Sequence, residues 1–253
     1  MRKLFRSLRN QIDGSDSGTH GKLHGTLDTP PPPGNLSLAM PRTLQPELLD
    51  ALPIDHPAAL HNRRDLRLTN AAMGNFRWFA RVLPALVRPG DKVLELGAGT
   101  GELGLQLQRA GLAVDGLDRW PRPAAWPASR AWHQADLEHF PDYAAYPIIT
   151  GNLIFHQFSD KALAALGAKL RAAARVIVAC EPARWRVSQL AFAILAPLLG
   201  ANYVSRHDAR VSIAAGFLGD ELPRALGLDA ATWECHVTFT FLGAYRFVAV
   251  RRP

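Results

Sequence analysis

Three glycines at alternate positions give the strongest chemical signal in this 253-residue sequence. Gly97, Gly99 and Gly101 follow a short apolar run and precede a segment of helical periodicity. A glycine-rich turn between a strand and a helix lets a ligand approach bare backbone, beside the unpaired N–H groups of the first helical turn. Position 102 is Glu, so the GxGxxG dinucleotide fingerprint is not satisfied, and a carboxylate there would repel a pyrophosphate. We therefore expect a ligand other than a nicotinamide or flavin cofactor.

The sequence around these glycines resembles a known family. The block from Val93 to Gly101, which reads VLELGAGTG, resembles the first motif of the class I S-adenosylmethionine-dependent methyltransferases. The resemblance includes the acidic residue two places before the first glycine, and it extends to Pro182. It implies S-adenosylmethionine as the cofactor. Glycines and nearby carboxylates would suit this ligand, because it carries a sulfonium and an ammonium group.

The resemblance also implies roles for residues at the ends of the predicted strands. Asp118, 17 residues after the last glycine, would bind the ribose hydroxyls, and Asp115 is the alternative inside the strand. Asp136 would bind the adenine amino group or, alternatively, cap a helix. Asn152 would orient substrate or cofactor or, alternatively, cap the backbone. The predicted cofactor-binding residues are Glu95, Gly97, Ala98, Gly99, Gly101, Asp118, Asp136 and Asn152.

Two histidines are candidate catalytic residues. Methyl transfer is an in-line displacement at a sulfonium carbon, so an enzyme holds the acceptor opposite the sulfur and, for a phenol or alcohol, removes a proton. His156 follows the fourth predicted strand, whose end faces the substrate crevice of open α/β sheets. His207 stands beside Asp208, and adjacent side chains of an extended chain point apart. A structural role is the alternative for both histidines. The spacing of the other histidines predicts no metal site.

Alternating strands and helices must position these residues. Apolar runs bounded by turn residues predict strands over 92–96, 113–118, 131–135, 146–152 and 175–180, and helical periodicity predicts helices over 102–109 and 160–173. Such alternation is typical of a doubly wound, mainly parallel sheet. Period-2 alternation over 233–241 and 244–251, on either side of Gly243, predicts an antiparallel hairpin. We therefore expect an α/β fold, a seven-stranded Rossmann-like methyltransferase sheet that ends in this hairpin.

Composition divides the chain into three parts. Residues 1–41 are basic and proline-rich, and we expect a disordered tail, which either frays or contacts a membrane surface. Residues 42–90 form a helical segment, with an amphipathic helix over 64–87 that breaks at Gly74 or Pro84. Residues 91–253 form the methyltransferase domain. Its apolar insert over about 184–220 is either a lid over the site or a buried packing helix, and a further helix is expected over 219–226.

The composition excludes several classes of protein. With 48% hydrophobic residues the chain can bury a large core, which excludes disorder of the whole chain. Two cysteines without a CxxC pair argue against a disulfide framework and a thiolate zinc site. The longest apolar stretch, 190–199, contains Pro197, whereas a membrane-spanning helix needs ~20 apolar residues. The net charge of +7 is compatible with an anionic partner but does not require one. We expect a cytoplasmic protein.

Missing subclass motifs narrow the expected substrate. Base-modifying amino-methyltransferases carry an Asn/Asp-Pro-Pro-aromatic element after the fourth strand, but Asn152 is followed by Leu153. RNA cytosine-C5 enzymes use a cysteine that is typically beside proline, and Cys180 has no such neighbour. We therefore predict an S-adenosylmethionine-dependent methyltransferase of a hydrophobic small molecule such as a phenol, quinone or polyketide, without a nucleic-acid partner. An RNA methyltransferase that uses the basic tail, and a catalytically silent methyltransferase-like binding protein, are the alternatives. The sequence predicts no particular oligomeric state.

Overall fold

A single mixed sheet organises the protein. The computed structural model describes residues 39–53 and 55–253, so most of the predicted tail lies outside the described residues. The strands are β1 (Val93–Leu96), β2 (Val114–Asp118), β3 (Trp132–Gln134), β4 (Ile148–Asn152), β5 (Val176–Pro182), β6 (Trp233–Phe239) and β7 (Ala244–Arg251). Their order in the sheet is β3-β2-β1-β4-β5-β7-β6. The first five strands pair in parallel and β7 is antiparallel to β5 and β6, which confirms the predicted fold class and hairpin.

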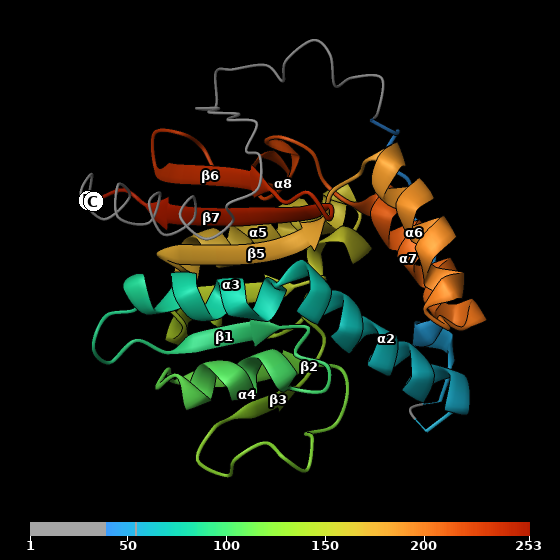
Figure 1. The fold of residues 1–253 in the computed structure, drawn as a ribbon. Coiled ribbons are helices and arrows are strands. Elements are labelled where there is room, and N and C mark those ends of the chain that lie inside the picture. Colours follow the sequence, from blue (N-terminus) through green and yellow to red (C-terminus); the bar gives the residue numbers. More distant parts are fainter. Residues whose placement is uncertain (1–38, 54) are drawn as a thin grey trace.

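Helices cover both faces of the sheet and one of its ends (Figure 1). α3 (Asn75–Val82) and α4 (Glu102–Arg109) cover one face, and α5 (Asp160–Ala173) and α8 (Glu221–Ala225) cover the other. α2 (Pro57–Met73), α6 (Arg186–Leu198) and α7 (Tyr203–Ala215) lie beyond the carboxyl ends of the parallel strands, where open α/β sheets bind their ligands. Short 3-10 helices are η2 (Leu49–Ala51), η3 (Leu83–Ala85), η4 (Tyr143–Ala145) and η5 (Phe155–Gln157).

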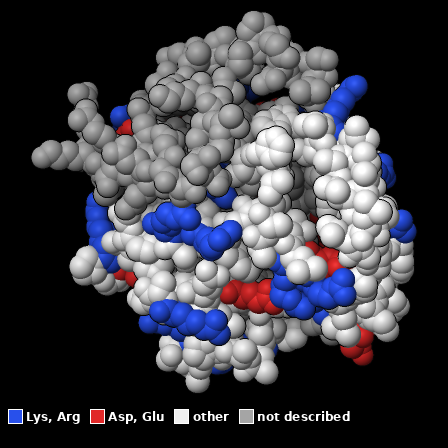
Figure 2. All heavy atoms as spheres, viewed as in Figure 1, with Lys and Arg blue, Asp and Glu red and all other residues white. Residues whose placement is uncertain are grey.

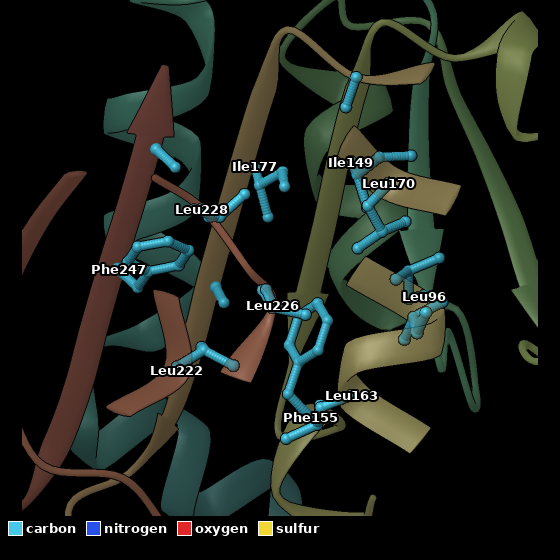
Figure 3. Close-up of a cluster of buried hydrophobic side chains, with 14 of the residues drawn as sticks. Leu96, Ile149, Phe155, Leu163, Leu170, Ile177, Leu222, Leu226, Leu228 and Phe247 are labelled. Atoms are coloured by element: carbon cyan, nitrogen blue, oxygen red, sulfur yellow. The ribbon is translucent and has the colours of Figure 1, made fainter. Parts of the chain in front are cut away.

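Two apolar layers hold the sheet between its helices. On one face, strand side chains such as Leu96 and Ile177 belong to the same buried cluster as Leu163 and Leu170 of α5 (Figure 3). On the other face, a second cluster contains side chains of α3 and α4, together with the other side chains of the central strands. Because both faces are covered, the central strands are buried along their whole length, as is typical of parallel sheets.

Local sequence explains the bounds of α5 and marks two exceptions in the strands. Ser159 caps α5 because its hydroxyl accepts a hydrogen bond from the N–H of Ala162 at 3.2 Å. The strand cores are apolar except for polar residues that include Glu95 in β1 and Glu181 in β5, both fully or almost fully buried. A buried carboxylate is costly unless it is paired or neutral. These two side chains therefore call for a specific explanation.

The predicted helix over 64–87 is divided in two. α2 begins earlier than predicted, with Pro57 in its first turn and the His56 side chain as its N-cap. The helix ends at Gly74, whose φ of 65° is left-handed, and α3 begins at the next residue. Gly74 is one of the two predicted break points. The predicted start was too late because the residues buried in the first two turns, Ala59 and Asn62, give no apolar stripe.

The apolar insert folds as two helices. α6 and α7 are joined by a turn at Gly200 and pack against each other. Only Ala196 of α6 is buried. Of the two alternatives for the insert, the buried packing helix therefore does not describe α6. α7 lies where the sequence pattern predicts no helix, and α8 is shorter than the helix predicted over 219–226.

Candidate functional site

The glycine loop joins β1 to α4, and its three glycines serve different purposes. All three have a left-handed φ, of 61° at Gly97, 53° at Gly99 and 76° at Gly101. A Cβ on Gly97 would lie 2.6 Å from the side chain of Ile154, and one on Gly101 would lie 2.9 Å from that of Trp126. Beside Gly99 the nearest atom is 4.0 Å away. Close packing therefore requires two of the glycines, and the open side of the loop is at Gly99.

Asp118 connects this loop to the end of β2. Its carboxylate accepts hydrogen bonds from the N–H of Gly99 at 2.7 Å and from that of Trp120 at 2.8 Å. Each oxygen keeps a further lone pair for a ligand hydroxyl. Asp115, the alternative residue, instead accepts from the N–H of Ala131 and from the hydroxyl of Tyr146 inside the protein. Of the two carboxylates, only Asp118 lies directly on the loop.

Glu95 lies under the loop and is neutral at pH 7. Its carboxyl lies so close to α4 that a Cβ on Gly104 would be 2.6 Å from Oε2. Burial raises the pKa of Glu95 to about 8; the backbone N–H of Gly104 opposes this shift and the charge of Asp118 adds to it. A protonated acid carries no charge to complement a cation. Glu95 therefore offers no negative charge to a ligand at neutral pH, and its predicted place among the cofactor-binding residues remains a prediction.

Three asparagines meet where β4 ends beside the junction of α2 and α3. Asn70 accepts hydrogen bonds through Oδ1 from the amides of Asn75 at 2.9 Å and of Asn152 at 3.0 Å. The Oδ1 atoms of Asn75 and Asn152 are buried and have no hydrogen-bond partner within the described part of the chain. Buried acceptors without a partner are costly, and a ligand ammonium would satisfy them. Of these three residues only Asn152 was predicted from the sequence, because Asn70 and Asn75 appear there simply as two amides within a helical segment.

Asp136 forms a local turn after β3. Its Oδ1 accepts a hydrogen bond from the N–H of Glu138 at 2.7 Å and lies 3.5 Å from Nδ1 of His139. Asp136 thus caps a turn over 137–139, and the helix that its alternative role required is not formed there. The side chain is 43% exposed. Its predicted contact with adenine remains a prediction.

His156 lies between two carboxylates at the carboxyl end of the sheet. Its Nδ1 is 2.6 Å from Oε2 of Glu181, and its Nε2 is 3.4 Å from Oε1 of Glu47. Burial would lower the pKa of His156, but the hydrogen bonds and charges of the two acids raise it to about 9. Glu181 also accepts the backbone N–H groups of Ile154 and Phe155. At neutral pH His156 is therefore a cation that donates to both acids, and the predicted role of free base does not fit it.

The second predicted histidine lies near the same acid. Burial would raise the pKa of Glu47, but hydrogen bonds from His156 and Ser212 and the positive charge of His156 lower it. His207 Nδ1 is 3.1 Å from Oδ1 of Asp208, a contact that adjacency in the sequence did not require. Both residues lie on α7 and not on an extended chain. Glu47 itself belongs to no motif, and no pattern in the sequence points to it.

Asp50 lies between the acids that contact the two histidines and the acid that contacts the glycine loop, and it feels the charge of both groups. Burial raises the pKa of Asp50, the charges of Glu47, Asp208 and Asp118 raise it further, and Arg119 at 3.9 Å opposes them. Asp50 therefore lies close enough to all three acids to feel their charge. The end of the sheet is an acidic environment, which favours a positively charged ligand.

The described residues hold no evident metal centre and no spanning helix. Across 39–53 and 55–253, no three His, Cys, Asp or Glu side chains are grouped so that they could hold a metal ion. Within the same ranges, no helix has the length and apolar character needed to cross a membrane.

Comparisons with known proteins place the fold. No protein-family model and no curated protein matches the sequence. The plantazolicin methyltransferase BpumL, solved in complex with SAH, is 11% identical with a TM-score of 0.59, over 79% of this chain and 92% of that chain. The plantazolicin methyltransferase BamL is also 11% identical, with a TM-score of 0.58, over 81% of this chain and 92% of that one. The pyocyanin biosynthetic protein PhzM is 17% identical with a TM-score of 0.54, over 78% of this chain and 60% of that one. With its sheet order and glycine loop, the chain therefore has the Rossmann-like fold of the class I methyltransferases.

Proposed function

We propose that the protein is an S-adenosylmethionine-dependent methyltransferase that acts on a hydrophobic small molecule. The observation that carries this proposal is the hydrogen bond from Gly99 to Asp118. It holds a carboxylate at the end of β2 against the open side of a GxGxG loop. An acid at this point of a doubly wound sheet is placed to read ribose hydroxyls.

The residues around the loop fit the chemistry of this cofactor. Asp118 would accept hydrogen bonds from the ribose hydroxyls, and the Oδ1 atoms of Asn75 and Asn152 would accept them from the ammonium group. Asp136 would contact the adenine amino group. The acidic surroundings at Asp50 favour a cation over a pyrophosphate. The cofactor supplies an activated methyl group on a sulfonium, and the protein supplies position and charge.

We assign the base to His207 and a positioning role to His156. The contact of His207 Nδ1 with Asp208 fixes the ring so that Nε2 faces away from this carboxylate and is available to take a proton. His207 is also partly exposed, as a residue that meets a substrate must be. His156 holds its own proton and fixes Glu47 beside the site. An acceptor hydroxyl would then be deprotonated as the methyl group is transferred.

The substrate class rests on two observations. The plantazolicin methyltransferase BamL was solved with a triazolic desmethylPZN analog and SAH, and PhzM is a pyocyanin biosynthetic protein, so structural neighbours act in small-molecule or peptide chemistry. In this chain, an apolar group formed by Leu48, Leu52 and Trp120 packs beside the acidic end of the sheet. No observation on the described residues favours the RNA-methyltransferase or silent-binding alternatives.

Calorimetric titration tests the cofactor. We expect S-adenosylmethionine and S-adenosylhomocysteine to bind with micromolar affinity and NADH not to bind. Asp118→Asn should weaken both by about tenfold or more, because it loses charged hydrogen bonds to the ribose. Glu138→Gln, an exposed amide substitution on the same rim, is the matched control and should bind normally. Binding of NADH, or an unchanged affinity in Asp118→Asn, would contradict the proposal.

A further inference from the structure

Beyond its first residue, Arg186, the side of α6 that faces away from the protein is apolar. The side chains at 3- and 4-residue spacing on this side are exposed, and they reach 78% exposure at Leu198. We call them the α6 outer face: Val187, Leu190, Ala191, Ile194, Leu195 and Leu198. Exposed apolar side chains on a monomer are normally scattered, and a contiguous stripe marks an interaction surface.

α6 lacks the polar outer stripe of a surface helix, and its inner side is mixed, with Phe192 and the buried Ala196 beside two polar residues. Its inner side carries Ser188 and Gln189, and the amide of Gln189 donates to the carbonyl of Arg210 on α7 at 3.0 Å. A surface helix normally buries its apolar stripe and exposes its polar one. The sequence thus places apolar side chains where they meet the surroundings of the protein.

The tip of the β6–β7 hairpin extends this surface. Gly243 lies against the first turn of α6, since a Cβ there would be 2.6 Å from Oγ of Ser188. Two apolar residues precede it at the tip, Phe241 with 99% exposure and Leu242 with 55%. An aromatic side chain held fully in solvent at a hairpin tip has no role in the core. It adds a second apolar contact beside α6.

Charge distinguishes the possible occupants of this surface. No acidic residue occurs from Ala183 to His207, and exposed arginines stand at position 186 in the first turn of α6 and at positions 206 and 210 of α7, which packs against α6. Figure 2 shows a largely uncharged surface over α6 with Lys or Arg at its margins. A two-fold contact between copies would bring like charges together, which is unfavourable. A surface of anionic lipid supplies apolar depth for the helix and negative headgroups for the arginines.

We propose that the α6 outer face and the hairpin tip dock on an anionic membrane surface. With 13 residues α6 is about 20 Å long, shorter than the ~30 Å hydrocarbon core, so it lies in the interface and does not span it. The flanking arginines lie at headgroup level while the apolar face enters the acyl boundary. This proposal does not rest on the methyltransferase activity.

Vesicle co-sedimentation of the full chain tests the proposal. The protein should bind phosphatidylcholine vesicles that contain phosphatidylglycerol, and bind pure phosphatidylcholine vesicles more weakly. The double variant Leu190→Glu/Ile194→Glu should lower binding by about tenfold or more, since each change places a charge on the apolar face. The matched control is Leu60→Glu/Leu68→Glu, the same change at exposed leucines of α2, which should bind as the natural chain does. Unchanged thermal unfolding of both variants shows that they fold.

Four outcomes would overturn the proposal. One is no binding of the natural chain to either vesicle, and another is an equal loss in the α2 control. A third is that a variant with the four basic residues of positions 1–10 neutralised no longer binds vesicles, while Leu190→Glu/Ile194→Glu still does. This result would assign the membrane contact to residues 1–10. The fourth is a dimer of the natural chain, seen by light scattering without lipid, that Leu190→Glu/Ile194→Glu dissociates.

Discussion

His156 joins two acids that are far apart in the sequence, with Nδ1 2.6 Å from Oε2 of Glu181 and Nε2 3.4 Å from Oε1 of Glu47. Glu181 is fully buried at the end of β5, whereas Glu47 belongs to the segment that precedes η2. The same segment is held by Asp208 of α7, which accepts the N–H of Leu48 at 2.7 Å. A protonated imidazole therefore connects the centre of the sheet to the chain that covers its end.

Removing one partner of this ion pair should destabilise the protein. Glu181→Gln leaves the His156 cation facing a neutral amide, and we expect the free energy of unfolding to fall by about 3 kcal/mol. Urea denaturation measures it. The matched control is Glu234→Gln, which breaks the partly exposed contact with His236 and should cost under about 1 kcal/mol. Equal losses in both variants would show that His156 is not a buried cation.

Stability should decrease as the pH rises from about 6 to about 9. The pKa of His156 rises from 6.5 to about 9 on folding, so its contribution is fully present below pH 6.5 and is lost as the pH passes 9. Burial raises the pKa of Glu95 from 4.5 to about 8, so ionisation also destabilises the folded state between these values. Urea titrations across this range measure the slope. Glu95→Gln removes one titrating group and should make the slope shallower, and an unchanged slope would contradict the neutral state of Glu95.

Two glycine substitutions should separate packing from ligand binding. Gly99→Ala strains a left-handed backbone at a cost of roughly 1–2 kcal/mol, but meets open space. Gly97→Ala carries the same strain and also clashes with Ile154, which adds about 1–3 kcal/mol. We expect Gly97→Ala to have the lower unfolding temperature, and Gly99→Ala to remain folded while S-adenosylmethionine binding weakens. If folded Gly99→Ala bound S-adenosylmethionine normally, this result would contradict the proposal that the glycine loop forms part of the cofactor site.

Asn70 should support the cofactor through the two amides that it positions. Asn70→Ala removes the acceptor for Asn75 and Asn152, and we expect calorimetric affinity for S-adenosylmethionine to fall by about tenfold. Asn62→Ala is the control on the same helix, because Asn62 contacts Asp208 and not the asparagine cluster. It should bind the cofactor normally. Equal affinity in the two variants would contradict the assignment of the cluster to the ammonium group.

The base assignment predicts a selective loss of rate in His207→Gln. With phenols and hydroxyquinones as acceptors and S-adenosylhomocysteine release as the signal, kcat should fall by about a hundredfold or more while cofactor affinity is unchanged. His61→Gln, another partly exposed histidine, is the control and should keep its rate. If His156→Gln lost activity and His207→Gln did not, the two roles would be exchanged.

The strands, the class of the sheet and the glycine loop could be predicted from the sequence because they depend on local patterns, whereas the order of the strands is given only by the structure. Continuous apolar strands, the turn at 97–101 and the alternating hairpin strands each lie within a short window. The bounds of α4 and α5 agree with their predicted ranges for the same reason. The start of α2 was missed because a histidine cap followed by proline carries no apolar periodicity.

The candidate site depended much more on tertiary structure. The sequence by itself determined the glycine loop, the acid at the end of β2 and the presence of two histidines near the sheet end. Only the tertiary structure decided that Glu95 is neutral, that His156 is a cation and that Glu47 stands near both histidines. The reason is physical: the charge state of a side chain depends on burial and on partners that the fold brings together from more than a hundred residues away, and no local pattern encodes them.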